Sequence, residues 1–336
     1  MSKRKIYDHY GLYVEQFFQA GRYLGFYTKD HIFLLVPDQS ASQDDWETKW
    51  NWAQQLMRLG DKSTALYIPP LSGQRAVPID GENQLLFQVP HMFAQKRLED
   101  GEELQAFHQL STRLFTETTS HFFTDRWCDW WGKRIDQLEN WFWNVRKKTT
   151  YTRVDRFFLQ TFPYYIGRAE NAIQYVKETA SLMPSFAKGS LCHFCYTPFS
   201  WVTVGEGINP VKLPVDWLYD HPARDIAEWV RYAFEEEYDH QQISTFIDQY
   251  TKTSRLSRLD RQLIFGRLLF PYYYIEQLER LYLQETIPER ETAERELRRL
   301  WDREAAHLDQ LAQFLKTEVS RWETEPKWLL QQKNFA

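Results

Sequence analysis

Residues 191–231 read LCHFCYTPFSWVTVGEGINPVKLPVDWLYDHPARDIAEWVR, and the order of elements in this stretch decides the fold. Ser190-Leu191-Cys192 is a short apolar strand, and a His-x-Cys sequence and a turn follow it. We expect a second strand over residues 211–217, with Asp216 at its end. A loop through His221-Pro222 then brings Asp225 to the start of an apolar-faced helix.

The same order surrounds the phosphotransfer centre of kinase-like proteins. There, H-x-D-x-x-x-x-N supplies a catalytic Asp and a metal-binding Asn, and a later Asp holds Mg²⁺. At that spacing this chain has His193, then Cys195 in place of the Asp and Ser200 in place of the Asn. Asp216 matches the metal-binding Asp, in a V-D-W that resembles the family's I-D-W. Asp225 matches the family's structural Asp.

On these residues the chain resembles the aminoglycoside-phosphotransferase/choline-kinase-like superfamily. It is most similar to the endospore coat-associated kinase-like proteins of the CotS/YutH group, and within that group to the YutH branch. The similarity in length and order covers nearly the whole chain, whereas its specific part is confined to His193 to Asp225.

The resemblance implies an α+β, bilobal protein-kinase-like fold of the aminoglycoside phosphotransferase type, with a small β-rich N-lobe and a large helical C-lobe. The expected parts are the N-lobe at 1–90, a hinge at 91–94, and the C-lobe at 95–336, with a degenerate catalytic loop at 191–200 and a metal-Asp strand at 211–217.

Patterning in the first 90 residues agrees with a β-rich lobe. Strand-like runs precede and follow a helix that Ser42 is placed to cap and Gly60 to end. Trp46, Trp50, Ala53 and Met57 form its apolar face.

From Gly101 onward the pattern is helical. We expect an interruption at Pro163, one helix from Leu256 to Leu283, and a last helix from Glu289 to about Trp322.

Composition excludes several classes of protein. The net charge of −5 gives no electrostatic reason to bind nucleic acid. The basic start lacks an apolar run of the signal-peptide type, and no stretch approaches the roughly 20 apolar residues of a membrane span. Three cysteines cannot build a disulfide framework. The aromatic share of 17% indicates an aromatic-rich core in preference to an interaction surface.

The chemistry that kinases need is largely missing. No Lys or Arg occurs between Asp30 and Thr48, so the strand Lys that pairs phosphates is absent, and Glu47 is expected to be a solvated helix residue. Gly11, Gly21 and Gly25 are too widely spaced for a phosphate-cradling loop. A thiol at position 195 is a poor hydrogen-bond acceptor for a substrate hydroxyl. We therefore expect no catalytic residues, with His193, Cys195 and Ser200 as degenerate positions.

Two other chemistries fit the motifs less well. Cys192-His193-Phe194-Cys195 is a C-x-x-C, but it opens a loop instead of a helix, and only Cys128 remains as a further thiol. E-x-x-H occurs at Glu237–His240 and at Glu304–His307, as in di-iron helical bundles. The β-rich first quarter argues against such a bundle. Glu304 is then a partly buried carboxylate balanced by a nearby Arg such as Arg298, Arg299 or Arg303.

The sequence therefore predicts a pseudokinase of the endospore coat. It would be made in the mother-cell cytoplasm, would bind other coat proteins and would lack a membrane span. Asp216 is a possible remnant magnesium site and Asp225 is structural, placed to cap its helix. We expect no resident cofactor, and at most weak Mg-ATP binding. The alternatives are an active small-molecule phosphotransferase with relocated catalytic groups, and a ligand-binding module that uses the interlobe cleft, with sugars stacked on Trp130 or Trp131.

Overall fold

The computed structural model describes residues 3–90, 100–119, 121–181, 186–204, 210–283 and 287–319. They form two compact units. Unit 1 combines residues 1–116, 189–225 and 248–253, and unit 2 combines 117–188, 226–247 and 254–336. The hinge expected at 91–94 lies outside the described residues. No helix in the described ranges has the length and apolar character to cross a membrane.

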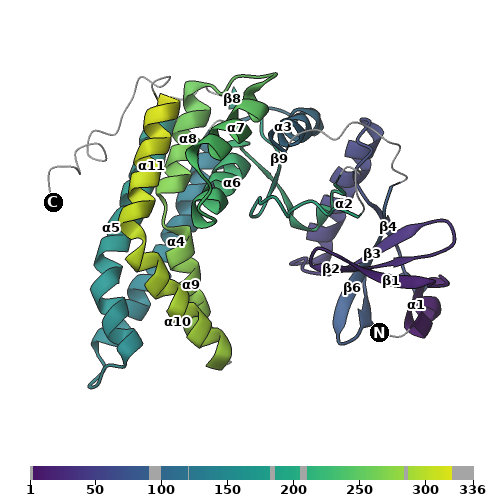
Figure 1. Cartoon of the computed structure of the whole chain (residues 1–336), viewed down its shortest axis with the longest axis horizontal. Coiled ribbons are helices and arrows are strands. Elements are labelled where there is room, and N and C mark those ends of the chain that lie inside the picture. The colour runs from purple at the N-terminus through teal and green to yellow at the C-terminus, as the bar shows by residue number, and fades with distance from the viewer. Residues whose placement is uncertain are drawn as a thin grey trace. The chain divides into compact units, whose positions relative to one another are not determined.

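Unit 1 contains an antiparallel sheet with the order β1-β2-β3-β6-β4, and β5 also pairs with β6 (Figure 1). The elements of this region are α1 (Lys3–Tyr10), β1 (Gln16–Ala20), β2 (Tyr23–Tyr27), β3 (Ile32–Pro37), α2 (Gln43–Arg58), β4 (Leu66–Ile68), β5 (Val77–Ile79) and β6 (Glu82–Gln88). The apolar runs of the first 90 residues therefore form the expected sheet, and β5 is an addition that the sequence did not indicate.

Helix α2 begins and ends at the predicted residues. The Ser42 hydroxyl accepts a hydrogen bond from the backbone N–H of Asp45 at 3.1 Å, which satisfies one of the free N–H groups of the first turn. Gly60 follows the helix with φ of +105°, a conformation that favours glycine. The buried face carries Trp46, Ala53 and Leu56.

The remainder of unit 1 contains most of the 191–231 stretch and the elements that pack around it. Its elements are α3 (Asp100–Ser111), the 3₁₀ turn η1 (Thr112–Leu114), β9 (Ser190–His193), the 3₁₀ turn η2 (Pro214–Asp216), β10 (Trp217–Asp220) and the start of α6 (Ala223–Glu235). The expected strand over 211–217 is wrong. Val211 makes only an isolated bridge to Val202, and Pro214 starts η2, so Asp216 lies before β10 and not at the end of a strand.

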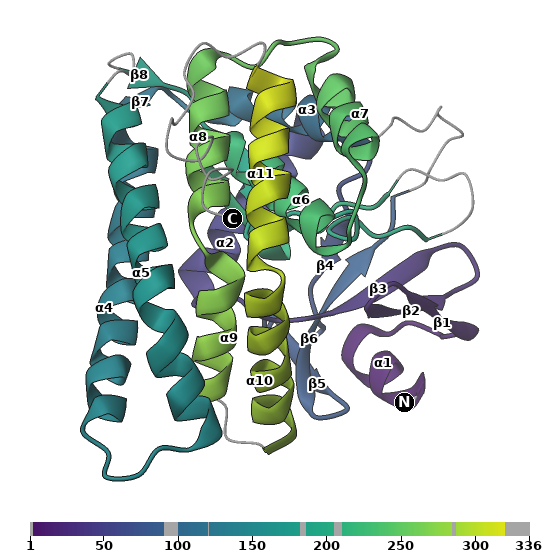
Figure 2. The ribbon, with the colours of Figure 1, turned by 60° about the vertical axis from the view of Figure 1, so that its left-hand side comes forward.

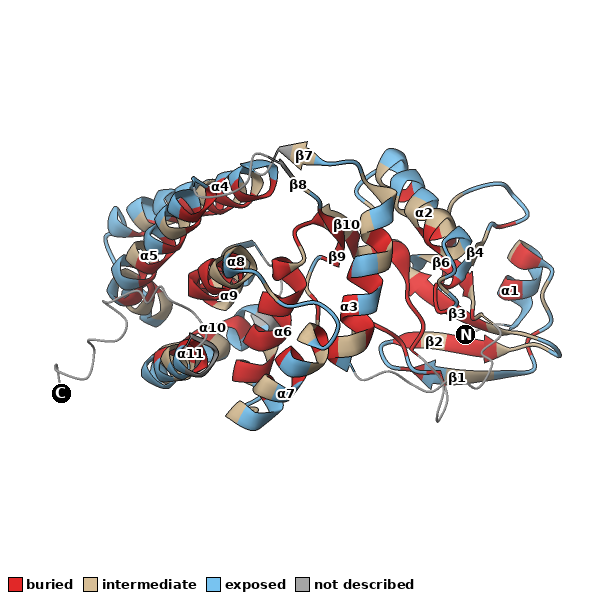
Figure 3. Cartoon of the chain, turned by 90° about the horizontal axis from the view of Figure 1, so that it is seen from above, coloured by how far each residue is buried: buried red, intermediate tan, exposed pale blue. Residues whose placement is uncertain are grey.

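Unit 2 is built of long helices (Figure 2). Its elements are β7 (Thr118–Thr119), α4 (His121–Arg146), α5 (Arg153–Ala180), β8 (Phe186–Ala187), the rest of α6, most of α7 (His240–Thr251), α8 (Arg258–Leu269), α9 (Tyr272–Leu283), α10 (Ile287–Asp302) and α11 (Glu304–Val319). Helices α4 and α5 lie side by side, and each buries one face (Figure 3).

Three predicted helix boundaries are corrected. Helix α5 continues through Pro163. Pro163 lies on the exposed side of the helix, so water can reach the carbonyl, four residues earlier, that receives no N–H from proline. The helix expected from Leu256 to Leu283 is two helices, because Phe270 is extended before Pro271. The last helix is also two, which meet at Arg303.

Aromatic side chains fill both units, as the composition indicated. Trp46, Trp201 and Trp217 are buried in unit 1. In unit 2, Trp131 is buried and stacks on Phe270 with ring centroids 4.4 Å apart.

Candidate functional site

The site is organised around a buried carboxylate on α6. One oxygen of Asp225 accepts a hydrogen bond from the backbone N–H of His193 at 2.9 Å. Its other oxygen accepts from His193 Nδ1 at 2.8 Å and from His108 Nε2 at 3.2 Å. Asp225 and His193 are fully buried, and His108 nearly so. Three elements, α3, β9 and α6, therefore meet at one carboxylate.

Two further side chains, those of Trp201 and Tyr250, fix the tautomers of the two histidines. Trp201 Nε1 donates to His193 Nε2 at 3.0 Å, and because an indole N–H can only donate, His193 carries its proton on Nδ1. His108 donates through Nε2, so its Nδ1 accepts from the Tyr250 hydroxyl at 2.8 Å. Every polar atom of both rings thus has a partner in the neutral form.

The pKa values follow from this arrangement. Burial alone would raise the pKa of Asp225, but its interactions with His193 and His108 outweigh burial and hold it far below its usual range. Burial lowers the pKa of His108. A charged carboxylate that receives three N–H donors is therefore the stable form.

Arg224 extends the same support to the backbone of the loop. Its Nε donates to the carbonyl of His193 and its terminal N–H to the carbonyl of Phe194, both at 2.9 Å. Its remaining nitrogen pairs with Asp220 at 2.9 Å. The sequence did not single out Arg224, which lies one residue before the predicted structural Asp.

The loop after His193 is held together by the hydroxyl of Ser200. Ser200 Oγ accepts from the backbone N–H of Thr197 at 2.8 Å and donates to the carbonyl of Cys195 at 3.3 Å. Cys195 is half-buried. In this loop the hydroxyl that replaces the metal-binding Asn closes a turn.

Cys195, Ser200 and Asp216 all line one cleft within unit 1, with a cavity volume of about 1070 Å³. The cleft also contains two cations that the sequence did not indicate. Arg22 follows Gly21 in the turn between β1 and β2, and Lys49 lies on α2.

The two cations are placed differently. Lys49 Nζ is held by Asp45 at 3.0 Å and by the carbonyl of Val215 at 3.1 Å, whereas Arg22 is exposed. Burial raises the pKa of Asp216, and His193 and Arg22 partly oppose this.

The predicted magnesium position has little support from neighbouring ligands. Within the described ranges one set of three potential ligands converges, His108, Cys192 and Asp225, and it does not include Asp216. Both nitrogens of His108 and both oxygens of Asp225 already have hydrogen-bond partners, so this set is a hydrogen-bonded core and not a metal site.

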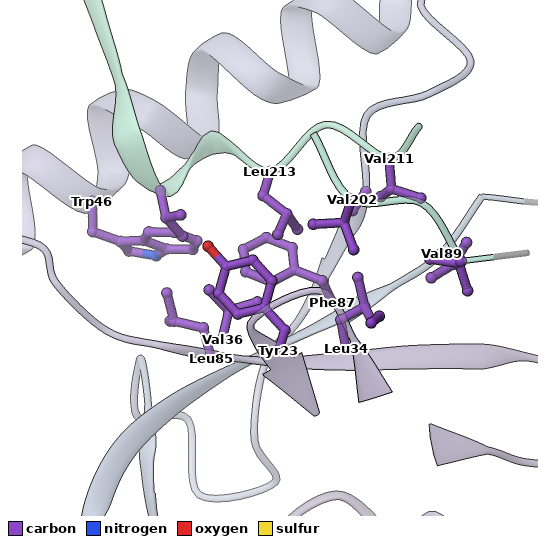
Figure 4. Packing of buried hydrophobic residues seen from close by; sticks show 14 residues of the cluster. Tyr23, Leu34, Val36, Trp46, Leu85, Phe87, Val89, Val202, Val211 and Leu213 are labelled. Carbon is purple, nitrogen blue, oxygen red and sulfur yellow. The ribbon is translucent and has the colours of Figure 1, made fainter. Parts of the chain in front are cut away.

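The inner face of the small sheet is covered by the chain itself (Figure 4). Leu34 and Val36 of β3, Leu85 and Phe87 of β6, and Val89 pack in one core with Val202, Val211 and Leu213. Leu34 and Phe87 are fully buried. The apolar side of the sheet is thus occupied by side chains from residues 202–204 and 211–215.

A buried lysine holds this covering segment in place. Lys212 Nζ pairs with Asp61 at 3.0 Å and with Glu103 at 3.3 Å, and it lies 5.1 Å from the Trp201 ring centroid. The charge of Lys212 lowers the pKa of Asp61 despite burial, whereas burial raises that of Glu103. No local pattern indicated this contact, because its partners lie far apart in the sequence.

The competing motifs are not assembled into sites. Cys192 is buried, its thiol contacts the carbonyl of His221 at 3.5 Å, and burial raises its pKa well above the usual range, which disfavours redox chemistry. Glu47 accepts a hydrogen bond from Gln43 on the exposed side of α2, as expected. Trp131 is buried and cannot stack a sugar.

The Glu304–His307 pair has a structural explanation. Glu304 pairs with Arg168 at 2.6 Å and accepts from the hydroxyls of Tyr164 and Tyr165. The balancing cation therefore comes from α5 and not from Arg298, Arg299 or Arg303, which corrects the prediction.

A family model described as "Spore coat putative kinase YutH" matches residues 3–314. The chain is also 30% identical over 289 residues to the "Endospore coat-associated protein YutH" of Bacillus subtilis (strain 168), and the match covers 84% of each chain.

Two solved phosphotransferase structures have the same fold. An aminoglycoside phosphotransferase from Alicyclobacillus acidocaldarius matches with a TM-score of 0.62 and 15% identity over 93% of each chain. The spectinomycin phosphotransferase APH(9)-Ia, in complex with ADP and its antibiotic, matches with a TM-score of 0.59 and 13% identity over 88% of this chain and 92% of its own. At these identities the likeness establishes the aminoglycoside phosphotransferase-like, kinase-type fold and nothing about activity.

Proposed function

The chain belongs to the spore coat YutH family, and from this premise we propose that it acts in the endospore coat as a pseudokinase, through binding and assembly. It keeps the scaffold of a phosphotransfer loop without the groups that would perform the transfer. Its relative is named endospore coat-associated, which supports the same location for this chain.

One observation carries the proposal. His193, Asp225 and Arg224 take part in five hydrogen bonds and ion pairs within the core, three of which involve the loop backbone, yet the side chain that the loop presents at position 195 is a thiol. A kinase needs an acceptor there for the proton of the substrate hydroxyl, and a thiol is a poor acceptor. The loop is therefore maintained for its shape.

The phosphate and base positions support the same interpretation. Strand β3 contains no Lys, so the clamp on the phosphates is missing. The apolar face on which a flat base would lie in a kinase is covered by Val202, Val211 and Leu213. Ser200 is engaged within its own loop and is a weak substitute for a metal-binding amide.

We place the protein first in the mother-cell cytoplasm and then in the coat, with other coat proteins as its partners and no role in nucleic-acid binding. The net charge of −5 supports the last point.

The test is a set of fluorescent fusions expressed from the native locus in a sporulating host. Cys195→Ser and Asp216→Asn should reach the coat at the wild-type level and give wild-type spores. Asp225→Asn, which removes charge from the core, should reduce deposition. If Cys195→Ser or Asp216→Asn folds normally but produces the spore defect of a full deletion, the protein has a chemical role and the pseudokinase proposal fails.

A second candidate function is small-molecule binding in the cleft. The observation that favours it is the cavity of about 1070 Å³ with Arg22, Lys49 and Asp216 on its walls. This candidate includes the alternative of an active phosphotransferase with relocated cations. Turnover of an alcohol substrate with Mg-ATP that disappears in Asp216→Asn would favour it over the pseudokinase.

A further inference from the structure

A second pocket lies within unit 2, beside the junction of α8 with α9 and the junction of α10 with α11. Its walls come from α5, α6, the corner between α8 and α9 at Phe270-Pro271, and the corner between α10 and α11 at Arg303. None of its residues belongs to the cleft that contains Asp216.

The arginines of this pocket donate hydrogen bonds to carbonyl groups at the ends of helices. Helix ends leave their last carbonyl oxygens without a helical partner. Arg168 donates to the carbonyls of Leu269 at 2.9 Å and Leu268 at 3.4 Å, at the end of α8. Arg303 donates at 3.4 Å to the carbonyl of Glu235, the last residue of α6.

A third arginine does the same. Arg231 donates to the carbonyl of Arg267, in the last turn of α8. The two helix breaks therefore gather guanidinium groups around a single space.

Positive charge exceeds negative charge around that space. Arg168, Arg231 and Arg303 line the pocket, against the carboxylates of Glu235 and Glu304. Behind the wall, Glu228 is shared between Arg231 and Arg267, so it does not restore the balance. Glu237, which also pairs with Arg303, is 72% exposed and therefore screened by water.

The protonation of His307 is consistent with a positive electrostatic potential in the pocket. A guanidinium cannot accept, so the 3.0 Å contact from Arg168 makes His307 Nε2 an acceptor and leaves the ring proton on Nδ1. Burial, followed by the charges of Arg168, Arg231 and Arg303, lowers the pKa of His307 well below its usual value. The ring is a neutral N–H donor in an electropositive pocket.

The size of the space limits the ligand. About 40 Å³ is open to the centres of water molecules, which is room for only a few waters at roughly 10–15 Å³ each. A nucleotide does not fit in this space, whereas a phosphate or carboxylate group does. Phe234, Phe270 and Pro271 supply apolar walls beside the charged ones.

We propose that this pocket binds a small oxyanion, the phosphate or carboxylate group of a small molecule, with Arg303 and His307 as its ligands. Arg303 is the cation that can turn toward a ligand, since its side chain is 29% exposed and pairs with Glu237, which is 72% exposed. Arg168 is excluded from this role, because all three of its guanidinium nitrogens are engaged with Glu304, His307 and backbone carbonyls.

The test uses the full chain and follows the imidazole C–H resonances by NMR during titration with inorganic phosphate, and separately with acetate, at ionic strength held constant with chloride. His307→Gln assigns the His307 resonance. Phosphate or acetate should shift it saturably and raise the pH at which it titrates, since a bound anion offsets the three arginines. Response to one anion only identifies which oxyanion the pocket takes.

Arg303→Gln should weaken this binding about tenfold, as expected for loss of a hydrogen bond to a charged group. Arg299→Gln is the matched control, because Arg299 also pairs with Glu235 but does not line the pocket. It should leave the affinity unchanged. The proposal is overturned by a His307 resonance that neither anion moves, by equal affinities of Arg303→Gln and Arg299→Gln, or by binding that is lost in Arg22→Gln, which would place the anion in the cleft.

Discussion

Asp225 accepts hydrogen bonds from both the backbone N–H and the side-chain Nδ1 of His193, at 2.9 and 2.8 Å. The two residues are 32 positions apart and fully buried. A single carboxylate thus fixes the end of β9 and the orientation of the imidazole together. This relationship makes the loop a rigid part of unit 1, whatever the chemistry of position 195.

Asp225→Asn should therefore destabilise the protein strongly. The amide cannot accept from all three donors, and it places an N–H against donors in the core. We expect a loss of about 3 kcal/mol or more in the free energy of unfolding, measured by urea denaturation at neutral pH.

The control for this experiment is Asp216→Asn. Burial raises the pKa of Asp216, so its charge does not stabilise the fold, and its replacement should change the free energy of unfolding by less than about 1 kcal/mol. Equal effects of the two variants would contradict the structural role assigned to Asp225.

Two buried histidines should weaken the protein in acid, whereas a third, His193, opposes them because, despite burial, Asp225 raises its pKa. The pKa values of His307 and His108 are lowered in the folded state. Below about pH 6.5 the unfolded chain binds protons on these residues that the folded chain does not, so stability falls with pH by up to about 1.4 kcal/mol per unit for each histidine.

His307→Gln isolates one of these protons. Between about pH 6.5 and 5, the stability of this variant should fall with pH less steeply than that of the wild type, by up to about 1.4 kcal/mol per pH unit. The measurement is urea unfolding at several pH values in chloride buffers. Parallel pH profiles for the two proteins would mean that His307 takes up a proton in the folded state.

The local parts of this structure were predictable from the sequence. Ser42 and Gly60 mark the ends of α2 because capping and positive φ depend on neighbouring residues only. Asp225 was expected to be structural and to cap its helix, and its carboxylate accepts hydrogen bonds from His193. Its expected helix-capping bonds are absent from the contacts of its carboxylate, because Asp225 is the third residue of α6 and both oxygens are used by histidines.

The contacts that the sequence could not indicate are long-range. His108 and Tyr250 lie more than a hundred residues from their partners, and Lys212 reaches Asp61 across 151 positions. The helix break at Pro271 depends on whether arginines from other helices can satisfy the freed carbonyls, as Arg168 and Arg231 do. Helical periodicity contains no information on that point.

Glycine substitutions should have opposite signs at two positions. A Cβ on Gly266 of α8 would lie 2.5 Å from Val176 on α5, so Gly266→Ala forces the two helices apart and should cost about 1–3 kcal/mol. Gly167→Ala meets no atom within 4 Å and should stabilise α5 by about 0.5–1 kcal/mol.

The pair Gly266→Ala with Val176→Ala supplies the control, since the smaller side chain leaves room for the new methyl group. The double variant should be less destabilised than the two single changes added together. If the effects simply add, steric contact with Val176 is not what requires glycine at 266. Thermal unfolding of the four variants measures both effects.

Millimolar Mg-ATP should give little change in the thermal unfolding of the wild type, because β3 has no Lys and the apolar face of the sheet is covered by Val202, Val211 and Leu213. A nucleotide at 100 times its dissociation constant would add about 2.7 kcal/mol, which corresponds to a shift of several degrees.

Cys195→Asp restores the acceptor that a kinase loop requires, but it should create no phosphotransfer to aminoglycosides or to choline-like alcohols. An aspartate at 195 supplies neither the missing strand Lys nor an amide ligand for Mg²⁺, and Val202, Val211 and Leu213 still cover the apolar face of the sheet. Arg22 and Lys49 line the same cleft and are the cations that could bind phosphates in place of the strand Lys. Activity in Cys195→Asp that disappears on adding Arg22→Gln would show that Arg22 has taken over the phosphate clamp and that the fold is one substitution away from catalysis.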